Sequence, residues 1–269
     1  MSGRLESMRL GSIAEINMLP ARVRDEIYLR LIPDPLLAVV SLDRQTLRGN
    51  GWHVPVRITA PDGSSWARVE LWARPDDRDP TLLLDVGMSG FAVPELSLVQ
   101  INDPSAPRFA IDRDEDGRDT LLGTACRNEV EEGRALAAGL APGQVRRGLR
   151  MLGAVLESMD EFCRLLGSEF YLLEPLFYHS AILYERRHCG YFIGRERMEE
   201  IDAGFQPGEE LQRRLDGSSP FRGQGLERTA RGRSWAIHDG ILADSWEGVK
   251  MFRAPQALSR ISTFPGGAY

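Results

Sequence analysis

The chain has 269 residues, enough for one large domain or two smaller ones that bury an apolar core without disulfides or metals. Its 42% hydrophobic and 27% charged fractions exclude a disordered or fibrous protein. The net charge of −6 and the pI near 5.4 argue against nucleic acid as a partner, because neutralising a phosphate backbone needs a net basic face.

The sequence also predicts a cytoplasmic protein with no membrane partner. The longest apolar run, residues 35–42, is well short of the ~18 residues that a membrane span needs. Charges interrupt the apolar residues of the N-terminus, so we expect no secretory signal. The three cysteines are far apart in the sequence and form no C-x-x-C pair, which favours reduced thiols.

An N-terminal arm, residues 1–50, is expected to be helical. Residues 21–32 keep apolar side chains at a helical period, and Pro33 and Pro35 then end the helix. From Trp52 onward the apolar period becomes two, which is typical of strands separated by short turns. The sequence therefore predicts an antiparallel β region over residues 51–125, with strands at 53–59, 66–74, 81–88, 96–103 and 107–114.

Residues 126–255 are predicted to be rich in helices and to complete the same core, before a tail at 256–269. Asn128 is a typical N-cap with Glu131 three residues later, and an amphipathic stripe predicts a long helix over 144–167. The other expected elements are a helix at 129–140, a strand at 170–174, a helix from Pro175, a strand at 190–194, a helix at 196–201, a loop at 204–232, and strands at 233–242 and 247–254. The predicted fold class is α+β, with an antiparallel or mixed central sheet flanked by helices.

The most specific pattern in the chain begins at Pro142. Arg146, Arg147 and Gly148 follow, a long helix closes on a glycine, a strand comes next, and Leu-Tyr-Glu-Arg at 183–186 leads into Gly-Tyr. This order, over residues 142–191, resembles the coenzyme A binding half of the GNAT acetyltransferase superfamily. In that family a strand leads into a Pro-x-x-Arg-Gly-x-Gly-x-Gly loop, which precedes the long helix.

The loop departs from the family motif at two positions. Arg150 and Leu152 stand where the motif has its next two glycines, and a frame shifted to begin at Arg150 keeps only Gly153. A turn at a helix N-terminus presents N–H groups to a pyrophosphate. The resemblance therefore implies that acetyl-CoA or another acyl-CoA is bound by Arg146, Arg147, Gly148, Arg150 and Gly153.

The resemblance further implies a GNAT-like acyltransferase that moves an acyl group to a small acceptor. Tyr184 would protonate the departing thiolate as the general acid. Glu174 at the end of the strand, and His179 or His238 near the substrate, complete the candidate catalytic residues. An alternative is a non-catalytic binding protein on the same scaffold, for which the replaced glycines are the supporting feature.

Glu185 and His188 form a Glu-x-x-His pair, which favours a metal site as a second hypothesis. The spacing puts a carboxylate and an imidazole on one helix face, as in carboxylate-bridged metal sites of helical bundles. With His238 or His53 as a further ligand, the pair would hold iron or zinc in a metal-dependent oxygenase or hydrolase. The same spacing also occurs on solvated helices.

Asp112, Asp114, Asp116 and Gly117 copy the first positions of a calcium-binding loop. The glutamate that such a loop needs at its last position is Gly123 here. Flanking helices are not predicted either, so an acidic hairpin turn is the alternative.

Three arginines, Arg228, Arg231 and Arg233, precede His238 and Asp239. Guanidinium groups bind carboxylates and phosphates through forked hydrogen bonds, so the cluster favours a small acidic or phosphate-bearing substrate. On the predicted strand His238 and Asp239 would point to opposite faces, and another neighbour would have to orient the imidazole. Solvated arginines on a loop are the alternative, and a homodimer is compatible with each of these hypotheses.

Overall fold

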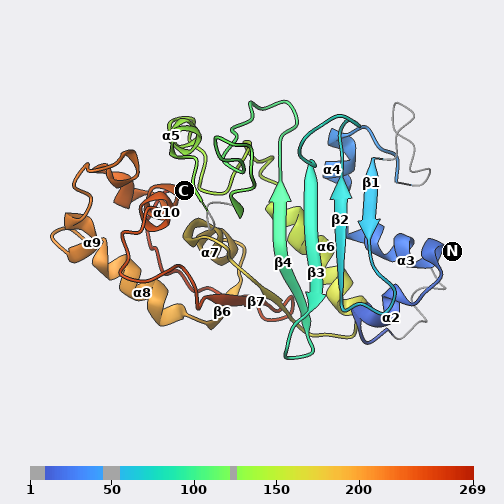
Figure 1. The fold of residues 1–269 in the computed structure, drawn as a ribbon. Helices are drawn as coiled ribbons and strands as arrows, with labels where there is room; N and C mark the ends of the chain where they lie inside the picture. Colours follow the sequence, from blue (N-terminus) through green and yellow to red (C-terminus); the bar gives the residue numbers. More distant parts are fainter. Residues whose placement is uncertain (1–9, 45–54, 122–125) are drawn as a thin grey trace. The chain divides into compact units, whose positions relative to one another are not determined.

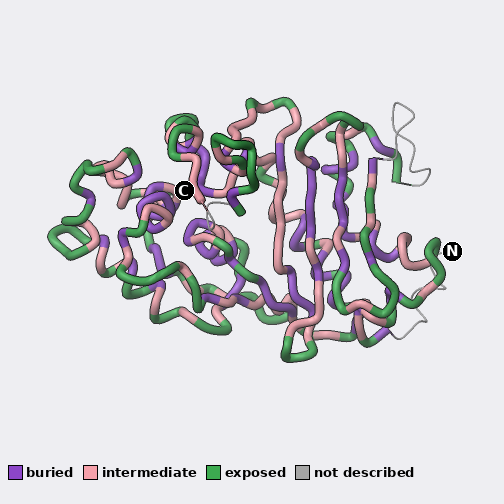
Figure 2. Tube along the Cα trace, in the orientation of Figure 1, coloured by how far each residue is buried: buried purple, intermediate pink, exposed green. Residues whose placement is uncertain are grey.

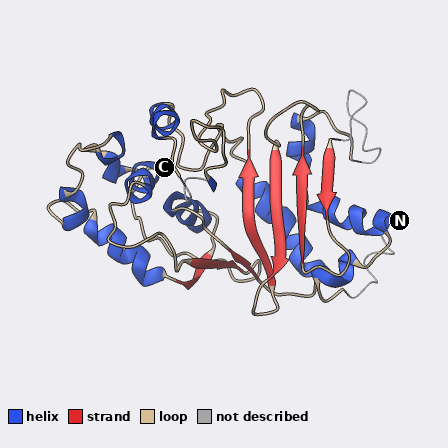
Figure 3. Ribbon diagram, viewed as in Figure 1, coloured by secondary structure: helices blue, strands red, loops and turns tan. Residues whose placement is uncertain are grey.

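The computed structural model describes residues 10–44, 55–121 and 126–269, so His53 lies outside the described residues. The predicted α+β class is confirmed, with a mixed sheet and flanking helices (Figure 1, Figure 3). The chain divides into two compact units of three segments each. Unit 1 consists of Met1–Ser105, Gly148–Glu174 and Phe252–Leu258, and unit 2 of Ala106–Arg147, Pro175–Met251 and Ser259–Tyr269. The expected division into residues 1–50, 51–125, 126–255 and 256–269 stays a prediction.

The predicted N-terminal helices are confirmed and belong to unit 1. They are α2 (Ile13–Asn17), α3 (Ala21–Tyr28), the short 3-10 helix η1 (Leu29–Leu31) and α4 (Asp34–Val39). Pro35 lies in the first turn of α4, where a missing N–H costs nothing, so the prolines also start a helix. Asn17 ties α2 to the sheet, because its amide donates to the carbonyl oxygens of Ser64 (2.8 Å) and Trp66 (3.0 Å).

Four of the predicted strands form an antiparallel meander in unit 1. They are β1 (Val56–Thr59), β2 (Trp66–Leu71), β3 (Leu82–Met88) and β4 (Pro94–Ile101). Val69 pairs with Leu84, and Leu84 pairs with Val99, so alternate apolar residues line one face. The N-terminal helices and α6 (Leu152–Leu165) cover this face, which buries much of β2 and β3 (Figure 2).

The fifth predicted strand is wrong, because residues 107–114 form a loop of unit 2. Their N–H groups find partners outside any strand pair. Phe109 donates to the carbonyl oxygen of Val145 (2.8 Å), and Ala110 donates to the carboxylate of Glu131 (2.9 Å). An apolar period of two indicates which residues face a core, but it does not indicate what their N–H groups bind.

A parallel strand follows the meander in unit 1. β5 (Tyr171–Leu173) pairs with β4 in parallel, so the chain needs a crossover between them, and α6 lies in it. The helix begins at Leu152 and not at the predicted residue 144, because Arg150 has a φ of 60° and a left-handed residue cannot continue a helix. Gly167, with a φ of 67°, follows the helix end as predicted. Phe162 of α6 packs on Tyr28 with ring centroids 6.0 Å apart.

Two further predicted strands are confirmed as β6 (Gly190–Ile193) and β7 (Lys250–Arg253). The strand order is β1-β2-β3-β4-β5-β7-β6, and the division between the units falls within β7. The helices of unit 2 are α5 (Glu129–Ala137), α7 (Tyr178–Glu185), α8 (Arg195–Gly204), α9 (Glu210–Arg213) and α10 (Ala230–His238), with the 3-10 helices η3 (Pro220–Arg222) and η4 (Leu226–Arg228). Within the described ranges, none of the helices is long and apolar enough to cross a membrane.

Two predictions for residues 204–242 are wrong. The expected loop contains α9, η3 and η4, and the strand expected at 233–242 is largely the helix α10. Thr229 begins this helix, because its hydroxyl accepts from the N–H of Gly232 (2.9 Å). A Cβ atom on Gly232 would lie 2.2 Å from the carbonyl oxygen of Leu226, so the close approach of η4 requires glycine.

The core of unit 2 surrounds Trp235 of α10. Its ring stacks on Phe221 with centroids 5.1 Å apart, and its indole N–H donates to the carbonyl oxygen of Leu140 (2.8 Å). Ile111 and Val145 complete the same buried cluster. The core therefore joins α10 to residues that lie about one hundred positions earlier in the chain.

A buried ion pair should stabilise unit 1 more than an exposed one of the same geometry. Arg253 forks onto Asp160 at 2.8 and 2.9 Å with side chains 11% and 10% exposed, whereas Arg68 forks onto Asp85 at 2.7 Å with side chains 41% and 21% exposed. We expect Arg253→Met to lower the free energy of unfolding by about 3 kcal/mol, because the buried carboxylate of Asp160 loses its charged partner and, among the described residues, keeps only the hydroxyl of Tyr171. Arg68→Met should cost less than about 1 kcal/mol in the same urea titration. Equal losses would contradict this ranking.

Candidate functional site

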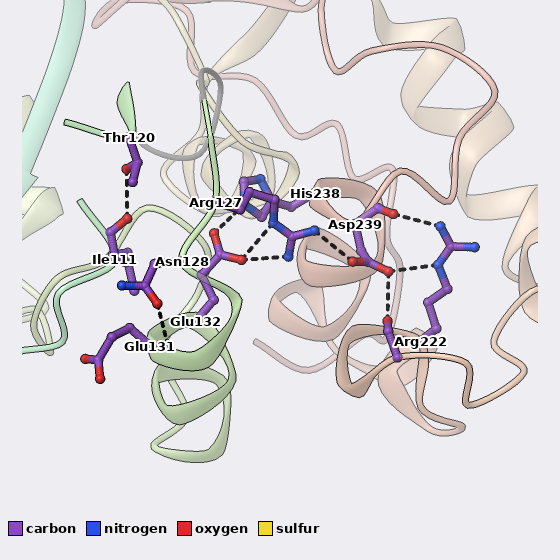
Figure 4. A network of polar contacts seen from close by, with 10 residues as sticks. Ile111, Thr120, Arg127, Asn128, Glu131, Glu132, Arg222, His238 and Asp239 are labelled. Atoms are coloured by element: carbon purple, nitrogen blue, oxygen red, sulfur yellow. Dashed lines mark hydrogen bonds and ion pairs between the residues drawn. The ribbon is translucent and has the colours of Figure 1, made fainter. Parts of the chain in front are cut away.

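A chain of five charged or titratable side chains crosses unit 2, and we call it the His238 network (Figure 4). Nε2 of His238 lies 3.0 Å from Oε1 of Glu132, whose Oε2 accepts from Nε of Arg127 at 2.8 Å. Arg127 also donates to Asp239 (2.8 Å), and Asp239 accepts from Arg222 (2.9 Å). Negative and positive charges therefore alternate from Glu132 to Arg222.

Local helix structure places the members of this network. Asn128 caps α5 by accepting from the N–H of Glu131 (3.2 Å), as predicted, which puts Glu132 in the first turn. His238 is the last residue of α10, and Asp239 is its C-cap. The expectation that these two side chains point to opposite faces of a strand is wrong, because the helix end lets both join one network.

The carboxylates of the network are ionised at neutral pH. Burial alone would raise the pKa of Glu132, but hydrogen bonds from His238 and Arg127 outweigh it and lower that pKa. Burial likewise acts to raise the pKa of Asp239, and the bonds from Arg127, Ser219 and Arg222 lower it overall. Glu132 is only 2% exposed, so its negative charge depends on these partners.

Two of the candidate catalytic residues, His179 and His238, lie on either side of Phe177. The Phe177 ring stacks on His179 with centroids 5.6 Å apart and meets His238 edge-on at 5.8 Å. Trp235 also meets His238 edge-on at 5.8 Å. The structure thus brings the two predicted histidines into one aromatic cluster of unit 2.

His179 is unsuited to accept a proton at neutral pH. Burial, reinforced by the nearby charges of Arg231 and His238, lowers the pKa of His179 to about 3. Its Nδ1 lies 2.9 Å from the hydroxyl oxygen of Ser234, which also accepts the backbone N–H of His179 (3.4 Å). This serine thereby caps the first turn of α7, a structural task.

The other candidate catalytic residues are placed differently. Tyr184 is buried in α7 of unit 2, and burial raises the pKa of its hydroxyl, so the phenol stays protonated as an acid must. Glu174 is exposed at the end of a segment of unit 1. Their predicted roles stay predictions.

The Glu-x-x-His pair does not share a helix face. Helix α7 ends at Glu185, and His188, with a φ of 64°, lies beyond it with Nδ1 3.3 Å from the carbonyl oxygen of Ser259. Glu185 accepts from the hydroxyl groups of Thr263 (2.6 Å) and Tyr191 (2.7 Å). The expected geometry is therefore wrong. In the part of the chain that the structure describes, no three His, Cys, Asp or Glu side chains are grouped to hold a metal ion.

The predicted phosphate-binding turn lies before α6. A Cβ atom on Gly148 would be 3.1 Å from the carbonyl oxygen of Ile101, the last residue of β4. Arg150 has left-handed backbone, and Gly153 lies in the first turn of α6. Met151, the N-cap, makes no side-chain hydrogen bond to this helix among the described residues. The turn thus leaves from the end of β4 into an N-terminus that no side chain caps in this region.

The two preceding arginines belong to unit 2. Arg146 donates to the carbonyl oxygen of Ala106 (2.7 Å), and Arg147 is exposed. Their expected part in binding a phosphate stays a prediction, as do those of Gly148, Arg150 and Gly153.

The acidic motif is a hairpin turn, as the alternative predicted. Arg113 and Asp119 form an antiparallel bridge, and Oδ1 of Asp114 accepts from the N–H groups of Asp116 (3.0 Å) and Arg118 (2.8 Å). Asp114 thus satisfies the backbone of the turn, as aspartates in tight turns commonly do.

The predicted arginine cluster is not a solvated group with one common task. Arg233 is 3% exposed, donates to Asp202 (2.6 Å) and lies 3.9 Å from the ring centre of Phe264. Arg231 packs on the ring of Tyr269 at 4.4 Å, and Arg228 is exposed. Arg233 therefore stabilises unit 2 from inside.

Comparisons with known proteins add nothing to this geometry: the scan of family models and the searches of curated proteins and of solved structures each returned no match. Sequence reasoning missed Arg127, Glu132 and Arg222. Glu132 is 106 positions from His238, and a carboxylate in the first turn of a capped helix is ordinary in sequence. Only the fold pairs it with an imidazole.

The buried His179 should make stability depend on pH. Its pKa is about 3 in the folded protein against 6.5 as the ordinary value, so the unfolded chain binds more protons between these limits and stability falls as pH drops below 6.5. Between pH 7 and pH 5 the loss from this one group is about 2 kcal/mol. We expect His179→Gln to remove it in urea titrations at both pH values. His188→Gln, at an exposed histidine, should keep the wild-type dependence; identical slopes in all three proteins would contradict the assignment.

Proposed function

We propose that the protein is an acyltransferase that takes an acyl group from acetyl-CoA or another acyl-CoA. The observation that supports this most is the position of Gly148 beside Ile101 in unit 1. The family motif requires a strand to run into the phosphate-binding loop, and the sequence before Pro142 is helical. Because the chain leaves β4 at Ile101 and returns to the same point at Gly148, β4 takes the part of that strand, and residues 106–147 are an excursion between them.

The order of elements around the turn also supports the proposal. β4, the turn, α6, β5 and α7 follow one another, and β4 and β5 are parallel. Ligands commonly bind beyond the carboxyl ends of strands, at points where neighbouring connections leave a sheet in different directions. The change from antiparallel to parallel pairing at β4 is such a point. The α6 N-terminus, which lies beside the carboxyl end of β4, offers N–H groups to a pyrophosphate.

Arg150 is the clearest local support. It stands where the family motif has a glycine, and its φ of 60° lies in the left-handed region, which glycine adopts more readily than other residues. A glycine-like conformation at the position where the motif has a glycine supports the proposal. Leu152, at the other replaced glycine, is the first residue of α6.

In this proposal the donor binds through the Gly148–Leu152 turn of unit 1. The general-acid role that the resemblance implies for Tyr184, in unit 2, stays a prediction. A protonated phenol at neutral pH suits that role. The acceptor would be a small molecule in the cytoplasm. The alternatives of a non-catalytic binding protein on this scaffold, or of an iron- or zinc-dependent oxygenase or hydrolase, stay predictions: the first requires binding without turnover, and the second stoichiometric metal in untagged protein.

Calorimetry and thermal shift with acetyl-CoA test the proposal. We expect saturable binding that weakens about tenfold in Arg150→Glu, because the new carboxylate would face the pyrophosphate. Arg164→Glu is the matched control, since it makes the same charge change in the last turn of α6, about 20 Å along the helix. The control should bind as the wild type does. No heat and no thermal shift at millimolar acetyl-CoA would remove the proposal.

Arg150→Gly should stabilise the protein. Relief of left-handed backbone outweighs the added freedom of glycine in the unfolded chain, so we expect the free energy of unfolding to rise by about 0.5–1 kcal/mol. Arg147→Gly is the control, because Arg147 is exposed and is not among the described residues with positive φ. It should lower stability by a similar amount. A loss of stability in Arg150→Gly would mean that the turn does not have the glycine-like shape of the motif.

A further inference from the structure

We infer that His238 is a proton-accepting base whose orientation is fixed by Glu132, with Arg127 as a second positioning residue. The chemistry assigned to it below rests on the proposed function, whereas its geometry does not. Both positioning residues are proposed to act through the imidazole and not on a substrate. They act by holding one nitrogen of the imidazole in place.

The contact between His238 and Glu132 selects one tautomer. An ionised carboxylate can only accept hydrogen bonds, so the 3.0 Å contact requires a proton on Nε2 of the imidazole. The neutral ring then carries its free lone pair on Nδ1. Among the described residues, Nδ1 of His238 has no hydrogen-bond partner. This nitrogen is therefore available to take a proton.

Glu132 cannot easily release the imidazole. Its second oxygen accepts from Arg127, which is itself anchored by Asp239 and stacked over the ring of Phe221 at 4.8 Å. Asp239 is held in turn by Arg222 (2.9 Å) and by the hydroxyl of Ser219 (2.8 Å). A carboxylate bound on both oxygens has one orientation, so it also holds the imidazole in one orientation.

The charges around His238 come from every neighbouring element. Glu132 and Arg127 approach from α5 and the segment before it, Asp239 follows in the chain, and neutral His179 approaches from α7. Two carboxylates and two guanidinium groups leave the network itself close to neutral. Glu132 acts on the imidazole through its contact with Nε2, which orients the ring.

His179 shows why only one histidine of the pair suits this role. Its Nδ1 lies 2.9 Å from the hydroxyl oxygen of Ser234, and the residue is 5% exposed. Nδ1 of His238 carries no such bond in the described structure. The candidate catalytic histidines thus divide into a structural one, His179, and an available one, His238.

In acyl transfer the acceptor would be an amine or an alcohol. Its nitrogen or oxygen forms a bond to the acyl carbon and gives its proton to Nδ1 of His238, while the bond between carbon and sulfur breaks and the thiolate takes a proton from solvent. The proton on His238 then returns to solvent. No oxidant, reductant or metal is needed for this balance.

Nitrogen-15 NMR of the imidazoles, recorded at a pH where they are neutral, tests the inference without any substrate. The His238 signals are assigned by their absence in His238→Gln. We expect wild-type His238 to be protonated on Nε2, and Glu132→Gln to give a mixture of tautomers, because an amide can donate as well as accept. Glu131→Gln, one residue earlier in the same turn, is the matched control and should keep the wild-type tautomer. Arg127→Met should give a smaller change in the same direction as Glu132→Gln.

Kinetics with acetyl-CoA and small amines give a second readout. Glu132→Gln should lower kcat about 100-fold and Arg127→Met about 10-fold, each with KM little changed. Wild-type His238 protonated on Nδ1, or identical spectra for Glu132→Gln and Glu131→Gln, would overturn the inference. The expected tautomers in a protein that does not bind acetyl-CoA would uphold the positioning of His238 and remove acyl transfer alone.

Discussion

The parallel pairing of β4 with β5 is the constraint on which much of the structure depends. Parallel strands cannot be joined by a tight turn, so the chain must leave one end of the sheet and return to the other. Here α6 makes that return, and Gly148 begins it beside the last residue of β4. Between these two neighbouring points the chain makes an excursion of residues 106–147 without disturbing unit 1. Unit 2 is built from this excursion and from two later segments.

Within unit 2 the requirement to pair buried charges constrains the fold in a comparable way. Glu132, Glu185 and Arg233 are each less than 9% exposed, and each is bonded to residues far away in sequence. An unpaired charge at such a site costs several kcal/mol, so these contacts restrict how the segments of unit 2 can meet. The apolar cluster around Trp235 supplies the driving force, and the charged contacts supply the selectivity.

Local patterns in the sequence sufficed for much of the fold and for little of the candidate site. The apolar period of two and the turn residues predict β1 to β4, and the N-cap Asn128 predicts α5, because these signals act over a few residues. The strand predicted at 107–114 is wrong because N–H groups of this segment bind Val145 and Glu131 and not a neighbouring strand. The strand predicted at 233–242 is wrong because a threonine four residues earlier caps a helix. The amino-acid composition does not indicate that each unit combines three separate segments of the chain. The pairing of Glu132 with His238 was invisible for the same reason, although His238 itself was named from sequence.

Bonding capacity separates functional candidates from structural charges in unit 2. The carboxylate of Glu185 accepts hydrogen bonds from Thr263 and Tyr191 and so joins the C-terminal residues to α7. The guanidinium group of Arg233 bonds to Asp202 and packs on aromatic rings. In both residues the polar groups are used in contacts that stabilise the folded chain. His238 differs, because the network reaches it from one side and, among the described residues, stops there with a nitrogen unused. A fold that needed only to neutralise Glu132 already has Arg127 for that purpose. Among the described residues this imidazole is held by a buried carboxylate and bonded on that side alone, and this is the observation behind our proposal that it transfers protons.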